Sequence, residues 1–249
     1  MSLFSTAKVV TVFTALGLPA GLIGMPLTLA TRDIGWMYRA GQRIANLGLR
    51  AAGITFDVEG RDNIPADRPC IYMSNHVSNL DPPALIPMMP GTPAVMVKKS
   101  LMRIPLLGPA MRMGKYVPVE RDGDRRSAVQ AARAAAEAIQ SGLSLLVFIE
   151  GTRSRTGRLL PFKRGPFHIA QSTGAPIVPV AIWGTERMMQ KGSAAITPGT
   201  AHIRFLPAIA PADHPNRNDL LHAVRQSILG VLPEYMHPLA EENETAARS

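Results

Sequence analysis

Apolar and polar positions alternate between Ile54 and Glu59, where Phe56 and Val58 are separated by polar side chains. A period of two is typical of a half-buried β-strand. Short apolar runs that are bounded by turn-forming residues predict further strands along the chain. We expect these strands at residues 70–73, 94–97, 116–119, 143–149, 177–182 and 202–206.

The longer segments between these strands predict helices. Residues 124–141 are rich in alanine, contain neither glycine nor proline, and end at Gly142. This segment is therefore the clearest helix, with Asp124 placed to cap it. Two more helices are expected at residues 166–173 and 218–231. Alternating strands and helices predict an α/β domain with a mainly parallel sheet flanked by helices on both faces.

The N-terminal segment has a different pattern. Residues 9–31 carry no charged side chain, and as a helix they would reach ~34 Å, enough to cross a ~30 Å hydrocarbon core. Glycines and prolines between residues 17 and 26 interrupt the run. A kinked span and two short helices that dip into one leaflet are therefore both open. A signal peptide is a third possibility, but no clear small-x-small cleavage site precedes Arg32.

Basic residues follow this apolar run. Their spacing would place four arginines on one face of a single helix. This pattern predicts a basic amphipathic helix on an anionic membrane surface, with an ordinary solvated face as the alternative. The four residues are Arg32, Arg39, Arg43 and Arg50.

Composition narrows the class of partner. With 249 residues and a net charge of +9, the chain suits one large α/β domain with a membrane appendage, and two full domains are not expected. A basic surface fits nucleic acid or anionic lipid. Aromatic residues make up only 5% of the chain and do not interleave with basic runs, so lipid is favoured and nucleic acid is not expected. The single cysteine, Cys70, permits no internal disulfide and suits a reducing compartment.

Residues 75–81, with the sequence Asn-His-Val-Ser-Asn-Leu-Asp, carry the strongest candidate chemistry. Turn-forming residues surround His76 and Asp81, so the imidazole is expected in a loop at the end of a strand. A carboxylate bonded to one ring nitrogen fixes the tautomer, and the other nitrogen can then take a proton from a hydroxyl. A loop histidine that is bonded to a carboxylate for turn stability would show the same spacing.

Three later blocks follow this motif in order, and together the four blocks resemble the glycerolipid acyltransferase family, the 1-acylglycerol-3-phosphate acyltransferases in particular. The resemblance covers roughly residues 55–210. One block departs from the family's usual form: in place of glycine followed by Ile-Asp-Arg, this chain has Gly114 and then Val119-Glu120-Arg121. The three blocks are Lys98-Lys99-Ser100-Leu101 with Ile104-Pro105-Leu106-Leu107-Gly108, then Phe148-Ile149-Glu150-Gly151-Thr152-Arg153-Ser154, then Ile177-Val178-Pro179-Val180-Ala181-Ile182.

The resemblance implies acyl transfer from a thioester donor to the free hydroxyl of 1-acylglycerol 3-phosphate, which gives phosphatidic acid in phospholipid biosynthesis. It makes His76 the general base and Asp81 its partner, with no covalent acyl-enzyme. It also places Arg153, Lys98 and Arg121 at the acceptor phosphate, where fixed cations are needed. The donor is expected to be acyl-CoA or acyl-carrier protein.

The block around Arg153 is expected to supply the remaining groups. Glu150 is assigned to orienting Arg153, because a carboxylate directly at a phosphate would repel it. The backbone amides of Gly151 and Thr152 are candidate donors to the oxyanion of the tetrahedral intermediate. For Arg153 and Lys98, a surface salt bridge is the alternative role.

Other chemistries find less support in the sequence. His76 and Asp81 would supply two metal ligands, but no third ligand follows with recognisable spacing, so neither a metal nor another cofactor is expected. A Gly-x-Ser-x-Gly elbow is missing from the sequence, and Ser78 is interpreted as a turn residue. Transfer to another lysolipid, such as lyso-ornithine lipid, stays open. So does a non-catalytic membrane lipid-binding protein, although the intact His76, Asp81 and Arg153 argue against it.

We therefore expect membrane-anchoring helices at residues 1–50, an acyltransferase catalytic domain at 51–240 and a disordered tail at 241–249. The expected partners are a lysophospholipid, the thioester donor and the bilayer. Residues 1–50 are the only segment whose composition predicts docking on that bilayer. The positive charge after the apolar run predicts that the catalytic domain lies on the cytoplasmic face of the membrane.

Overall fold

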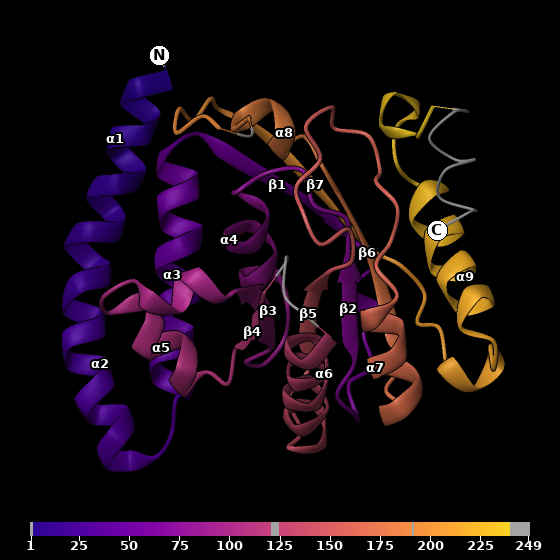
Figure 1. Cartoon of the computed structure of the whole chain (residues 1–249). Helices are drawn as coiled ribbons and strands as arrows, with labels where there is room; N and C mark the ends of the chain where they lie inside the picture. The colour runs from indigo at the N-terminus through magenta and orange to yellow at the C-terminus, as the bar shows by residue number, and fades with distance from the viewer. Residues whose placement is uncertain (1, 121–124, 191, 240–249) are drawn as a thin grey trace.

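The computed structural model describes residues 2–120, 125–190 and 192–239 of the chain. Its centre is a seven-stranded sheet with the strand order β1-β7-β6-β2-β5-β3-β4 (Figure 1). Each of the predicted strands is present. They are β1 (Ile54–Glu59), β2 (Ile71–Ser74), β3 (Ala94–Lys98), β4 (Val117–Val119), β5 (Leu145–Phe148), β6 (Ile177–Trp183) and β7 (Gly199–Phe205).

The directions of the strands place the loops that carry the motifs at one edge of the sheet. The strands from β6 to β4 run parallel to one another. Strand β7 runs antiparallel to β6, and β1 runs parallel to β7. The prediction of a mainly parallel sheet is thus confirmed. Because the carboxyl ends of parallel strands meet at one edge, the loops that follow β2, β3, β5 and β6 lie along the same edge.

Helices cover both faces of the sheet, as predicted (Figure 1). Along β2, Ile71 and Met73 pack into the apolar core on one face, while Tyr72 packs into the core on the other. This alternation follows from the period of two in a strand. The first core is shared with α6 (Arg125–Gln140), α7 (Gly165–Thr173) and α9 (Arg217–Leu229), and the second with α3 (Gly35–Ala51) and α4 (Asp81–Leu85).

The helices expected at residues 124–141, 166–173 and 218–231 correspond to α6, α7 and α9. The cap predicted at Asp124 lies outside the described residues. The remaining short elements are η2 (Arg61–Asn63), η3 (Ile86–Met88), η4 (Lys99–Arg103), α5 (Leu107–Met113), α8 (Thr185–Met188), η5 (Pro211–Asp213) and η6 (Glu234–Met236).

The N-terminus forms a helical hairpin along one side of the domain (Figure 1). The helix α1 (Ser2–Val12) runs through one π-helical turn, η1 (Phe13–Gly17), directly into α2 (Leu18–Thr31). The glycines and Pro26 therefore leave the helix continuous. Residues Leu3–Thr31 are long and apolar enough to cross a membrane by length and composition. Helix α3 then runs back beside α1 and α2.

The expected face of four arginines needs one correction. Arg32 lies in the turn between α2 and α3, where its positive φ of 57° ends α2. Arg39, Arg43 and Arg50 share α3 and are exposed. The tail predicted at residues 241–249 lies outside the described residues.

Candidate active site

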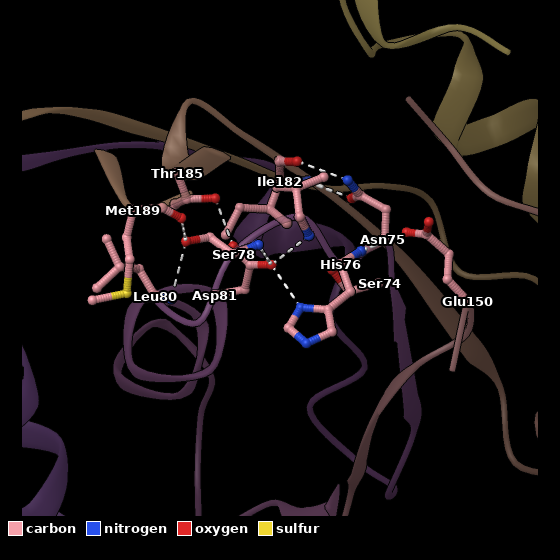
Figure 2. A network of polar contacts seen from close by, with 11 residues as sticks. Ser74, Asn75, His76, Ser78, Leu80, Asp81, Glu150, Ile182, Thr185 and Met189 are labelled. Atoms are coloured by element: carbon pink, nitrogen blue, oxygen red, sulfur yellow. Dashed lines mark hydrogen bonds and ion pairs between the residues drawn. The ribbon is translucent and has the colours of Figure 1, made fainter. Parts of the chain in front are cut away.

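The loop that follows β2 is tied to its neighbouring strand by one amide side chain (Figure 2). Asn75 Nδ2 donates to the carbonyl of Ile182 at 2.8 Å, and the amide of Ile182 donates to Asn75 Oδ1, also at 2.8 Å. The side chain thus copies a backbone pairing and extends the contact between β2 and β6 by one residue. His76, the next residue, therefore leaves the sheet from a fixed point.

Asp81 opens α4 and is completely buried. Its Oδ2 accepts from the amides of Val77 and Ser78 at 2.8 Å each, and it lies 2.7 Å from His76 Nδ1. Its Oδ1 accepts from the Thr185 hydroxyl at 2.6 Å. A carboxylate that accepts at this distance requires the proton on Nδ1, which leaves Nε2 of His76 as the acceptor.

The imidazole of His76 is held by packing as well as by Asp81. Its ring stacks on Phe148 with 4.1 Å between ring centroids. In Figure 2 the nitrogen that does not bond Asp81 points away from the polar network. A base in this position is oriented before a substrate arrives, which is what general-base catalysis requires.

The loop after β5 forms hydrogen bonds with both the backbone amide and the backbone carbonyl of His76. Glu150 Oε1 accepts from the His76 amide at 2.6 Å, and the Ser154 amide donates to the His76 carbonyl at 2.9 Å. Glu150 Oε2 accepts from the Leu160 amide at 2.9 Å. The expectation that Glu150 orients Arg153 therefore needs correction, because its two oxygens bond backbone amides and orient the His76 loop instead.

Burial also changes the acidity of Glu150. The side chain is 1% exposed, and removal from water raises its pKa to about 8, although the His76 and Leu160 amides pull in the opposite direction. Its proton is therefore held through a pH range in which an exposed glutamate has lost it.

The backbone amide of Gly151, expected as an oxyanion donor, has a structural role instead. This amide donates to the Phe148 carbonyl at 3.1 Å and so closes a turn, so the expectation that it donates to the oxyanion needs correction. The same expectation for Thr152 stays a prediction. The turn needs glycine because φ is 70°, in the left-handed region. Thr152 and Arg153 follow it, both partly buried.

The cations expected at the acceptor phosphate lie on the side of β5 and β3. Lys98 is exposed at the end of β3. Its neighbour Lys99 pairs with Glu120 at 2.9 Å. Since β5 separates β2 from β3, and strands lie ~4.8 Å apart, Lys98 begins about 10 Å from the β2 loop. Arg121 lies outside the described residues.

Comparison with known proteins places this site in a family. The model of a family described as Acyltransferase matches residues 55–183, which include the dyad and the loop after β5. The chain belongs to this acyltransferase family.

Named relatives of this acyltransferase point the same way. It is 42% identical over 142 residues to the chloroplastic 1-acyl-sn-glycerol-3-phosphate acyltransferase BAT2 of Brassica napus, covering 56% of this chain and 40% of that one. It is 31% identical over 208 residues to the 1-acyl-sn-glycerol-3-phosphate acyltransferase of Limnanthes douglasii, covering 82% and 73%. The chain thus spans about two fifths of the Brassica protein and nearly three quarters of the Limnanthes one.

A solved structure matches the fold. The crystal structure of the 1-acyl-sn-glycerophosphate acyltransferase PlsC from Thermotoga maritima superposes with a TM-score of 0.82 and 27% sequence identity. The match covers 94% of this chain and 98% of the Thermotoga chain. The similarity therefore includes the N-terminal helices as well as the sheet.

Two residues that hold the acyltransferase dyad were missed by the sequence analysis. Thr185 follows Asp81 by 104 positions, and only the strand order brings its hydroxyl to that carboxylate. Its position just beyond a predicted strand was the available signal. Asn75 was interpreted as a turn former, and nothing in its local sequence indicates the pairing with Ile182.

Ser78 has the structural role expected of it. Its hydroxyl donates to the Met189 carbonyl at 2.8 Å and also accepts from the Leu80 amide at 3.3 Å. Across residues 2–120, 125–190 and 192–239, no group of three or more His, Cys, Asp or Glu side chains is arranged to hold a metal ion. The expectation of a site without a metal or other cofactor stays a prediction.

Proposed function

We propose that this acyltransferase moves a fatty acyl group from a thioester donor to the free hydroxyl of 1-acyl-sn-glycerol 3-phosphate and so produces phosphatidic acid. The observation that carries the proposal is the dyad geometry. Asp81 holds His76 Nδ1 at 2.7 Å and leaves Nε2 as the only basic ring nitrogen. Relatives that carry this activity in their names support the choice of acceptor.

The dyad accounts for each proton in the reaction. Nε2 of His76 takes the proton of the acceptor hydroxyl as its oxygen attacks the thioester carbonyl carbon. Collapse of the tetrahedral intermediate breaks the carbon–sulfur bond, and the imidazolium returns the proton to the departing thiolate. The charge of Asp81 stabilises the imidazolium between these steps. Such a base contributes ~10²- to 10⁴-fold to the rate.

Binding of the acceptor phosphate is assigned to Arg153 and Lys98. Arg153 lies in the loop after β5, the strand next to β2, and Lys98 ends β3, the strand beyond β5, so a phosphate between them places the glycerol hydroxyl toward His76. Arg153 offers two parallel N–H donors, whereas Lys98 offers a point charge.

The hairpin is assigned to a single leaflet, with the catalytic domain on the cytoplasmic face. The long N-terminal helix touches the domain at two separate points, one in α1 and one in α2. The Thr6 hydroxyl accepts from the Ile196 amide at 2.9 Å, and Leu106 packs against Gly21. A helix attached along its length lies beside the domain and cannot cross a bilayer without pulling the domain into it. Its exposed apolar side chains would enter the hydrocarbon; they include Leu18, Leu22, Ile23, Leu27 and Leu29.

A panel of acceptors tests the proposed activity. Purified protein would receive 1-acylglycerol 3-phosphate, its phosphate-free monoacylglycerol analogue or a lyso-ornithine lipid, each with acyl-CoA or acyl-carrier protein as donor. We expect phosphatidic acid as the main product, detected by mass spectrometry. A protein that acylates lyso-ornithine lipid and leaves 1-acylglycerol 3-phosphate unchanged would contradict the proposed acceptor.

A further inference from the structure

A ridge of exposed apolar side chains lies beside the hairpin, on η4, at the start of α5 and on the turn between them. Leu101, Ile104 and Leu107 are 36%, 41% and 44% exposed. Single exposed apolar residues are normal on a soluble surface, but three of them within seven positions form a local patch. We call these three side chains the apolar ridge.

The ridge is held firmly by its own backbone. Gly108 donates to the Ile104 carbonyl at 2.8 Å, and a Cβ at Gly108 would collide with the Met102 carbonyl oxygen. Arg112 donates to that same carbonyl at 2.9 Å. Leu106 has a φ of 65°, which is rare for leucine, and its side chain packs on Gly21 of α2. The exposed side chains are therefore presented by a fixed turn.

The charge around the ridge is mainly positive, although Lys99 of η4 pairs with Glu120 at 2.9 Å. Residues 82–119 contain no aspartate or glutamate. Positive side chains beside apolar ones are the composition of surfaces that bind anionic lipid, where each cation contributes ~1 kcal/mol. The basic residues of this segment are Lys98, Lys99, Arg103, Arg112 and Lys115.

The ridge is also continuous with the apolar hairpin. The packing of Leu106 on Gly21 joins α5 to α2, and Figure 1 shows α5 next to the two long N-terminal helices. The exposed Leu22 and Ile23 of α2 follow Gly21 directly. A bilayer that covers this part of α2 would therefore meet the ridge as well.

We infer that the apolar ridge docks into an anionic bilayer as a second membrane contact, in addition to the hairpin. Leu101, Ile104 and Leu107 would enter the acyl region while the neighbouring cations stay at the level of the lipid phosphates. Because η4 begins directly after Lys98, this contact brings the predicted phosphate-binding edge of the site to the headgroup layer. The inference rests on the proposed membrane position of the hairpin and not on the identity of the acceptor.

A probe on the ridge tests this inference directly. Cys70 is the chain's single cysteine and is completely buried, so Ile104→Cys creates a unique accessible thiol for an environment-sensitive fluorophore. The full chain would be bound to vesicles of phosphatidylcholine and phosphatidylglycerol that contain a spin-labelled lipid. We expect a blue shift and at least a twofold quenching of the probe. The matched control is Val129→Cys on α6, a 60% exposed apolar residue on a helix that packs on the other face of the sheet from α3, which should show neither change.

A second readout uses activity. Replacing Leu101, Ile104 and Leu107 together by serine should lower the ratio of vesicle activity to detergent activity by about tenfold, because apolar insertion is lost. Serine at Val129 and Val231 should leave the ratio unchanged.

A probe at residue 104 that stays in water on vesicle-bound protein would overturn the inference. So would a probe that responds to an acidic acyl-carrier protein and not to vesicles. The probe needs no substrate, so its failure is separate from a failure of the acyl-transfer assay.

Discussion

Thr185 acts on His76 without touching it. Its hydroxyl donates to Asp81 Oδ1, while Oδ2 of the same carboxylate bonds the imidazole. Thr185→Val removes one hydrogen bond to a buried charge, worth ~1.5–3 kcal/mol. Because the dyad is loosened rather than the substrate contacts, we expect kcat to fall about tenfold or more with KM nearly constant. Thr185→Ser should recover most of the rate, and an equal loss in both variants would point to packing instead.

Glu150 should make the stability of the folded protein depend on pH. Its pKa is raised to about 8 by burial, so the folded protein keeps a proton that the unfolded chain releases near pH 4.5. Stability from this group is therefore complete below pH 4.5 and is lost as the pH rises through 8, by at most ~1.4 kcal/mol per pH unit. Unfolding in detergent at pH 5.5 and 7.5 should show this decline.

Glu150→Gln should make the decline shallower, although it lowers stability overall because its NH₂ group faces a backbone donor. Glu137→Gln is the matched control, since Glu137 is exposed on α6 and pairs only at the surface with Arg133. The control should keep the slope of the unmodified protein. Identical slopes in all three proteins would mean that another group causes the pH dependence.

At the scale of elements, the loop after β5 has two tasks. Its Glu150 and Ser154 fix the His76 backbone, and its Arg153 is assigned to the acceptor phosphate. Arg153→Lys should raise KM for 1-acylglycerol 3-phosphate by about tenfold and change KM for monoacylglycerol little, because an ammonium cannot copy the two-pronged contact. Steady-state kinetics on both acceptors would measure this. An equal rise for both would show that Arg153 supports the loop and does not bind phosphate.

Helices and strands were predictable from the sequence where they depend on residues close to one another in the chain. The alternation at residues 54–59 and the alanine-rich helix at 125–140 depend on near neighbours, and both are present as predicted. Thr185 and Asn75 depend on contacts across more than 100 positions, which strand order alone creates. The role of Glu150 was missed because it depends on the His76 amide, 74 positions earlier in the chain, which the pairing of β2 with β5 brings to the carboxylate.

In the whole molecule, the hairpin packs against the catalytic domain, whereas the sequence predicted a separate membrane-anchoring segment. Leu49 of α3 is buried in the core shared with α4, and the Tyr38 hydroxyl donates to the Pro93 carbonyl at 2.7 Å. Helix α3 is therefore part of the packed domain, whereas α1 and α2 mainly cover its side.

Deleting residues 1–31 should accordingly leave a folded enzyme. We expect vesicle activity to fall at least tenfold more than activity on detergent-dispersed lysolipid, because the apolar helix is lost and the domain is kept. Deletion of residues 1–50 should instead unfold the protein, since it removes Leu49 and Tyr38. A 1–31 deletion with an unchanged ratio of the two activities would show that the helix does not position the site at the membrane.

The central claim is that His76 acts as the general base, and the turnover of His76→Ala tests this claim most directly. Phosphatidic acid formation would be measured with saturating donor and 1-acylglycerol 3-phosphate, and binding of the lysolipid would be measured separately. We expect kcat to fall ~10³-fold or more, while lysolipid binding changes little. Near-normal turnover in His76→Ala would contradict the assignment of His76 as the base.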